Sequence, residues 1–138
     1  MVEYALIVVP FFLLLFGVFD LSRAVFYQHL LTSSAREAAR YGVAAQRTPT
    51  SICQAAVRAT AASLPGAPAS FDCTSAASGP VTSGGLTVTV SRDPVGATDR
   101  YVRVQLQYVF QPLTPLIASV VGGVVPLGAS SAMYVEQE

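Results

Sequence analysis

Residues 5–19 read ALIVVPFFLLLFGVF, an uninterrupted apolar run that follows Glu3 and Tyr4 and precedes a longer helical pattern. A helix of this length spans ~22 Å at a rise of ~1.5 Å per residue, whereas the hydrocarbon core of a bilayer is ~30 Å thick and usually takes ~20 apolar residues. The run therefore predicts a marginal membrane anchor, which costs less to extract than a full span. An ordinary single-pass anchor that tilts or locally thins the bilayer is the alternative.

The helical pattern continues from Asp20 to about Ala44 and becomes amphipathic, so we predict one long helix. Pro10 lacks an N–H and its ring crowds the carbonyl of Leu6, which predicts a kink. The face expected to pack inward comprises Leu21, Val25, Gln28, Leu31, Ala35, Ala38 and Gly42. The opposite, polar face comprises Asp20, Arg23, Tyr27, Ser34, Glu37 and Tyr41.

A second, shorter helix follows a break after the long one. Ser51 and Gln54 form a capping-box pattern ahead of a helix from about Ile52 to Leu64, which Pro65 and Gly66 end. Residues 66–85 are rich in Ala, Ser, Thr, Pro and Gly, and they predict a surface loop.

The remaining residues alternate apolar and polar side chains as strands do. We predict strands over 86–91 and 102–108, joined by a hairpin connection at 93–99, and a last strand from about Leu127 to Val135. Residues 116–121 predict a short helix or turn. The strands share one apolar face that the amphipathic half of the long helix can cover. The fold class is α+β, with a long N-terminal helix on a small antiparallel sheet.

The composition excludes several functions. The formal net charge is zero and charged residues make up 12% of the chain, so no basic surface for a nucleic acid is expected. His29 has no Ser and Asp at a known catalytic spacing. Asp93 and Asp99 fall short of the roughly 6 to 8 oxygens that calcium takes. We therefore predict no enzymatic activity, no metal and no cofactor.

Cys53 and Cys73 are the only cysteines. One pair cannot supply a four-ligand metal site, so a disulfide is favoured, with the head in an oxidising compartment. Closing this loop would contribute ~3 kcal/mol by the chain-entropy model. Two buried free thiols are the alternative.

The basic residues bear on orientation in the membrane. Arg23, Arg36, Arg40 and Arg47 all follow the apolar run, so the positive-inside rule alone places the head in the cytoplasm. A cleaved basic leader before Met1 would reverse that orientation and agree with the disulfide.

Two stretches resemble a known family: VEYALIVVPFFLLLFGVFDLSRAVFYQ at 2–28 and AREAARYG at 35–42. They resemble the TadE-like pilins of tight-adherence (Tad) pili, a branch of the type IV filament family. The shared features are the Val-Glu-aromatic-Ala-Leu start, the proline within the apolar run, the step from Asp20 to Arg23 and the Ala-Arg-Glu-Ala-x-Arg-Tyr run. Beyond Gly42 the chain matches only in style.

The resemblance implies a type IV pilin-like fold and a mechanical role. The chain would be a structural subunit of an extracellular filament for surface adhesion, reached through a single-pass intermediate in the inner membrane. Implied partners are other copies of the chain or other pilins, the membrane before assembly, a prepilin peptidase and the pilus assembly machinery. A monomeric, membrane-anchored adhesion or binding module is the alternative function.

We expect two parts: an apolar membrane and filament-core helix at 1–25, and a globular head at 26–138. The resemblance implies that Glu3 pairs with the N-terminal amine of an adjacent subunit; a solvated acid at a helix start is the alternative. The family's glutamate is fifth in the mature chain, so either two residues are absent here or processing differs. Asp20 and Arg23 can pair within one chain or between subunits. The predicted subunit interface comprises Glu3, Tyr4, Leu6, Ile7, Pro10, Phe11, Leu14, Gly17, Val18, Leu21 and Arg23.

Overall fold

The computed structural model describes residues 2–44, 47–61, 63–66, 71–92, 101–114, 118–119 and 122–134. Two α-helices and a four-stranded antiparallel sheet make up the described fold, which confirms the predicted α+β class. The sheet order is β1-β2-β3-β4. The elements are α1 (Val2–Val43), α2 (Pro49–Ala61), η1 (Thr74–Ala77), β1 (Val81–Ser83), β2 (Leu86–Arg92), β3 (Tyr101–Phe110) and β4 (Val125–Tyr134).

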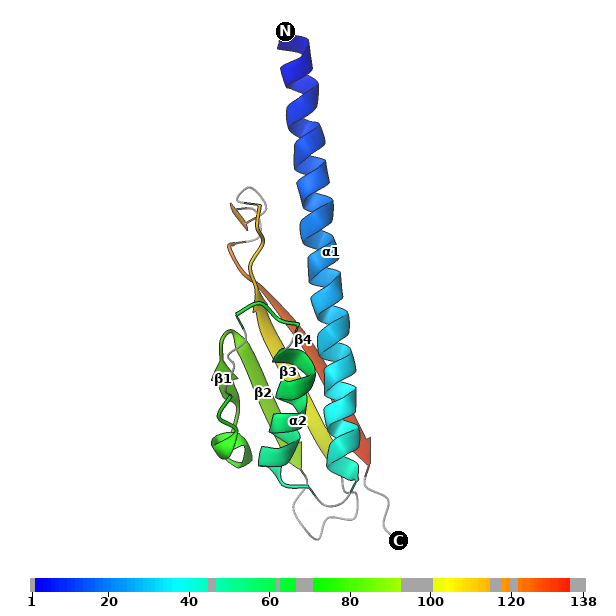
Figure 1. Cartoon of the computed structure of the whole chain (residues 1–138), viewed down its shortest axis with the longest axis vertical. Helices are drawn as coiled ribbons and strands as arrows, with labels where there is room; N and C mark the ends of the chain where they lie inside the picture. Colours follow the sequence, from blue (N-terminus) through cyan, green and yellow to red (C-terminus); the bar gives the residue numbers. More distant parts are fainter. Residues whose placement is uncertain are drawn as a thin grey trace.

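Both α-helices cover one face of the sheet, and the N-terminal part of α1 projects beyond the head (Figure 1). The helix α1 is continuous through Pro10. A kink of the helix axis at Pro10 stays a prediction. The apolar run therefore lies in the projecting part of the helix, beyond the sheet.

The buried face of α1 differs from the predicted one. Leu21 and Val25, expected to pack inward, are 65% and 48% exposed, whereas Tyr27 and Ser34, expected on the polar face, are buried. A helix turns ~100° per residue, and Leu21 and Val25 lie roughly a quarter-turn or more off the stripe that meets the sheet. That stripe comprises Asp20, Ala24, Tyr27, Leu31, Ser34, Ala35, Ala38, Ala39 and Gly42.

The second helix begins earlier than predicted, and its cap is a different residue. The backbone N–H of Ser51 donates to Oγ1 of Thr48 (3.3 Å), and the Ser51 hydroxyl donates to the Thr48 carbonyl (2.8 Å). Thr48 therefore takes the capping role assigned to Ser51, and Pro49 fills the first helical position, where its missing N–H costs no hydrogen bond. The helix ends at Ala61 rather than Leu64.

The predicted loop at 66–85 was wrong in part, because it contains η1 and a fourth strand. The strand β1 pairs with β2 through Val81, Thr82 and Ser83, across a turn whose Gly84 and Gly85 have φ of 56° and 77°. A three-residue strand is too short to show a clear alternation of side chains. The predicted disulfide between Cys53 and Cys73 is formed and ties α2 to the residue before η1.

The remaining strands are confirmed, with longer bounds. On β3, Val102, Val104, Leu106, Tyr108 and Phe110 face the helices and are buried. The predicted end of the last strand at Val135 and the connection at 93–99 lie outside the described residues. Of the predicted short helix at 116–121, only residues 118–119 are described, and they are helical.

Candidate functional site

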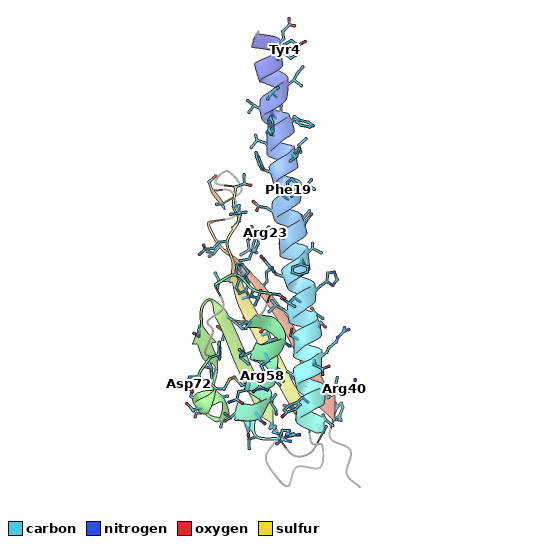
Figure 2. The ribbon with its side chains drawn as sticks, viewed as in Figure 1. Tyr4, Phe19, Arg23, Arg40, Arg58 and Asp72 are labelled. Atoms are coloured by element: carbon cyan, nitrogen blue, oxygen red, sulfur yellow. A yellow bond between two sulfur atoms is a disulfide. The ribbon has the colours of Figure 1, made fainter. Side chains whose placement is uncertain are left out.

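The part of α1 before Asp20 presents apolar side chains on all sides (Figure 2). Every side chain from Leu6 to Phe16 is exposed; Leu6 is 77% exposed and Leu14 is 72% exposed. A contiguous apolar surface of this extent marks a contact with a membrane or another protein. Among the described residues, α1 is the one helix long and apolar enough to cross a membrane.

The residues predicted to form the subunit interface lie on this surface or at its lower end. Gly17 and Arg23 are half-buried, and the other predicted interface residues are exposed. Glu3 lies near the free end of the helix and has no ion pair within the described part of the chain. Contacts of these residues with another subunit stay a prediction.

Asp20 marks the point where the apolar surface ends and the head begins. Its side chain is buried, and its two carboxylate oxygens accept the backbone N–H groups of Leu113 (3.1 Å) and Thr114 (3.0 Å). Nη1 of Arg23 lies 3.6 Å from Oδ1 of Asp20, so these two residues pair within one chain. The carboxylate thus fastens the connection after β3 to the long helix. We call this arrangement the Asp20 clamp, made of Asp20, Arg23, Leu113 and Thr114.

An aromatic cluster lies directly below the Asp20 clamp. The guanidinium carbon of Arg23 is 5.7 Å from the ring centre of Tyr27 and 5.5 Å from that of Phe110. Tyr27 in turn packs against the rings of Tyr108 and Phe110 at 5.8 and 5.9 Å. Each cation–π contact of this kind contributes ~0.5 to 2 kcal/mol. The cluster therefore holds Arg23 against the head and away from the free surface of the helix.

Two further hydrogen bonds fasten the head around this junction. The Tyr108 hydroxyl donates to the Pro65 carbonyl at 3.0 Å, and burial raises the pKa of Tyr108 above its ordinary value. Nε2 of Gln28 donates to the Gly128 carbonyl at 2.8 Å, which joins α1 to β4. The bond thus engages one carbonyl of β4, the outer strand of the sheet.

Sequence reasoning identified Asp20 and Arg23 but missed Leu113 and Thr114. These backbone donors lie 93 and 94 residues from Asp20, so no local spacing reveals them. The one available signal is that an acid beside an apolar run needs partners when it is buried.

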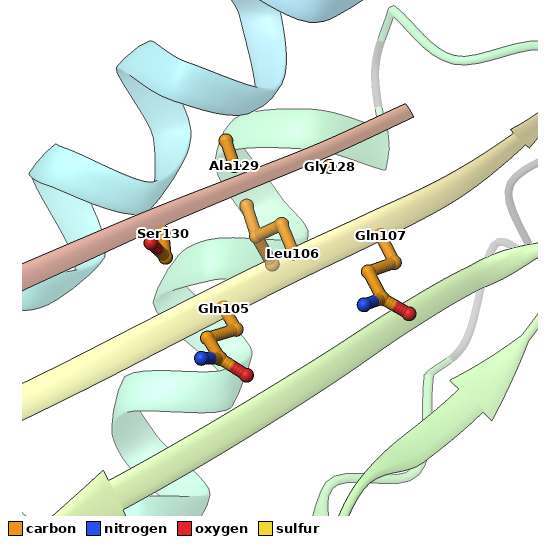
Figure 3. Close-up of a pocket in the computed structure, with 6 residues that line it drawn as sticks. All are labelled: Gln105, Leu106, Gln107, Gly128, Ala129 and Ser130. Carbon is orange, nitrogen blue, oxygen red and sulfur yellow. The ribbon is translucent and has the colours of Figure 1, made fainter. Parts of the chain in front are cut away.

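Two open hollows are formed by described residues of the head. The first, of ≈ 250 Å³, lies over the paired strands β3 and β4 beside Gly128, which has no side chain, and is lined by Gln105 and Gln107 (Figure 3). The second, of ≈ 550 Å³, lies between α1 and β4 and includes the exposed His29 and the half-buried Met133. Within the described ranges, no group of three or more His, Cys, Asp or Glu residues is placed to hold a metal ion.

Comparison with known proteins bears on the N-terminal segment alone. The family model described as TadE-like protein matches residues 1–40. Searches of curated proteins and of solved structures found no match to the chain. The matched segment contains the apolar run together with Asp20 and Arg23, whereas the sheet lies outside it. The resemblance inferred from the sequence is thereby confirmed over this segment: residues 1–40 are TadE-like.

Proposed function

We propose that this chain is a structural pilin subunit of an extracellular Tad-type, type IV-like filament, which polymerises through its apolar helix and serves surface adhesion. The observation that supports it is the exposed apolar surface of α1. Only 6% of the most apolar 18-residue stretch of this helix is buried within the chain. The TadE-like match covers the same surface.

The shape of the exposed surface favours a polymer as its final environment. Apolar side chains cover the helix on all sides, so one flat partner would leave part of the surface in water. Copies packed around each helix, as in a filament core, would cover every side. A bilayer also covers every side, but the run at 5–19 spans only ~22 Å of a hydrocarbon core of ~30 Å.

We further propose that residues 1–25 form the filament-core segment and residues 26–138 the head. In this arrangement Glu3 pairs with the N-terminal amine of an adjacent subunit, and a single-pass membrane intermediate precedes assembly. The partners are other copies of the chain or other pilins. The Asp20 clamp supports this division, because it fixes the head at the end of the apolar surface.

Shearing of cells followed by negative-stain imaging tests the proposal. The chain is expected in the sheared, filamentous fraction. Because both native cysteines are bonded to each other, a Leu14→Cys variant carries a single free thiol on the apolar surface. That thiol should resist a membrane-impermeant maleimide in filaments and react after the filaments are dissociated in detergent.

A Tyr134→Cys variant is the matched control, because Tyr134 is 75% exposed on the head. Its thiol should react in both states. Recovery of the chain in the membrane fraction alone, without filaments, would contradict the proposal and favour a monomeric membrane-anchored adhesion module.

A further inference from the structure

The described part of the connection between β3 and β4 extends beyond the sheet and lies beside α1 near the level of Phe19 (Figure 2). Its described residues are 111–114, 118–119 and 122–124. The Asp20 clamp sets its height, because the N–H groups of Leu113 and Thr114 are bonded to the Asp20 carboxylate. Phe19, the last residue of the apolar run, directly precedes Asp20. The connection therefore lies at the boundary between the apolar helix and the polar head.

The connection exposes two large apolar side chains, beside the exposed but uncharged Gln111 and Ser119. Leu113 is 75% exposed and Val124 is 46% exposed. Beyond α1, the described head exposes only two other large apolar side chains, Val109 and Tyr134, and Tyr134 lies at the opposite end of β4. No charged residue occurs in the sequence from Gln111 to Val135. On either side of Asp20, α1 exposes two more apolar side chains, Phe19 at 62% and Leu21 at 65%.

We propose that this connection is a second membrane contact of the subunit before assembly, with Leu113 and Val124 entering the boundary between lipid headgroups and acyl chains. The proposal rests on the membrane intermediate of the proposed function. When residues 5–19 lie in the bilayer, Leu113 is held at their end by Asp20 and cannot stay far from the lipid. A run that is short for a full span draws the head closer to the membrane still.

The charges around the connection fit this position. The Asp20 carboxylate is satisfied by two N–H donors and Arg23, so it needs no water from outside. Arg23 lies ~6 Å further along the helix axis than Phe19 at ~1.5 Å per residue, at the depth of the headgroups. Its side chain is 33% exposed although Nη1 is buried, so the positive charge lies close to the level at which lipid phosphates would be found.

Tryptophan fluorescence tests the contact, because the native chain contains no Trp. The full chain is reconstituted in vesicles of phosphatidylcholine and phosphatidylglycerol, with or without bromine on the acyl chains. Leu14→Trp reports insertion of the helix. Leu113→Trp and Val124→Trp report the proposed contact, and Tyr134→Trp is the matched control on an exposed site at the far end of β4.

Brominated lipid should quench the tryptophan emission of the Leu14→Trp, Leu113→Trp and Val124→Trp variants and should leave the emission of the Tyr134→Trp variant unchanged. Quenching in Leu14→Trp with none in Leu113→Trp and Val124→Trp would overturn the contact and leave the membrane intermediate standing. A loss of quenching in Leu14→Trp as well would overturn both. A blue-shifted, unquenched emission of Leu113→Trp that grows with the protein-to-lipid ratio would assign this surface to a neighbouring copy instead.

Discussion

The backbone N–H of Leu113 donates to the carboxylate of Asp20 over 3.1 Å and so joins positions 93 residues apart. This bond, with its neighbour from Thr114, fastens the connection after β3 to α1 at the base of its projecting, apolar part. In the proposed filament the head and the helix must keep a fixed relation, because each subunit repeats the geometry of the last. A buried carboxylate meets that need, since moving the connection would leave its charge without partners.

Asp20→Asn should lower the free energy of unfolding by ~2 kcal/mol, because hydrogen bonds to a charged group are each worth ~1.5 to 3 kcal/mol. An amide offers one acceptor oxygen to the two N–H groups and no charge to Arg23. Chemical denaturation in detergent measures the change. Glu37→Gln, at an exposed position on the same helix, should change the stability by less than ~0.5 kcal/mol. Equal stabilities of the two variants would contradict a structural role for the Asp20 clamp.

Gly42→Val should destabilise the head by ~1 to 3 kcal/mol through overpacking. A Cβ at Gly42 would lie 2.9 Å from both Ile52 Cδ1 and Val102 Cγ1, so the buried side chains of Ile52 and Val102 would have to shift. Gly79→Val is the matched control, because a Cβ there meets nothing within 4 Å. Thermal unfolding of the two variants should separate them clearly, and an unchanged midpoint for Gly42→Val would show that the helices can move apart freely.

Reduction of the disulfide should loosen η1 and β1 before it melts the rest of the sheet. Cys53 and Cys73 are both buried, and their bond closes a separation of 20 residues. Loss of a crosslink of this size costs ~3 kcal/mol by the chain-entropy model. Hydrogen exchange after reduction should rise first at residues 74–83 and later on β2 and β3. A simultaneous rise in all strands would contradict this order, and native labelling of both cysteines without reductant would contradict the disulfide itself.

Glu3→Ala should impair filament assembly much more than folding. Glu3 lies near the free end of α1, remote from the sheet, and its proposed partner belongs to another subunit. Removing one member of a desolvated charge pair leaves the other uncompensated at every subunit. Counting filaments by negative stain, at matched levels of the chain in the membrane, measures the effect. Filaments in normal number would mean that the carboxylate is a solvated acid at a helix start.

The sequence was most informative where the pattern was long and local. The apolar run, the alternation on β3 and the pairing of Cys53 with Cys73 were all predicted correctly. The predictions were wrong where contacts between distant parts of the chain determine which residues are buried. Leu21 and Val25 look like core residues, yet the head lies against Asp20 and Tyr27 instead: Asp20 bonds the connection after β3, and Tyr27 packs on β3.

Short structural features were also not predicted from the sequence. The strand β1 offers three residues, of which only Val81 is apolar, and its pairing with β2 depends on the Gly84–Gly85 turn. Thr48 caps α2 because Pro49 can begin a helix, a signal that the neighbouring Ser51 and Gln54 pattern obscured. The subunit contacts of the apolar surface involve other molecules, so neither local pattern nor the single chain reveals them.

Photo-crosslinking from Leu14 in sheared filaments tests the central claim most directly. Leu14 is 72% exposed in the single chain and lies in the middle of the apolar run. A benzophenone side chain placed there and activated in intact filaments should form adducts with residues 2–25 of another copy or of another pilin, identified by mass spectrometry. Adducts with lipid alone, in a chain recovered entirely from the membrane, would contradict a role in the filament core.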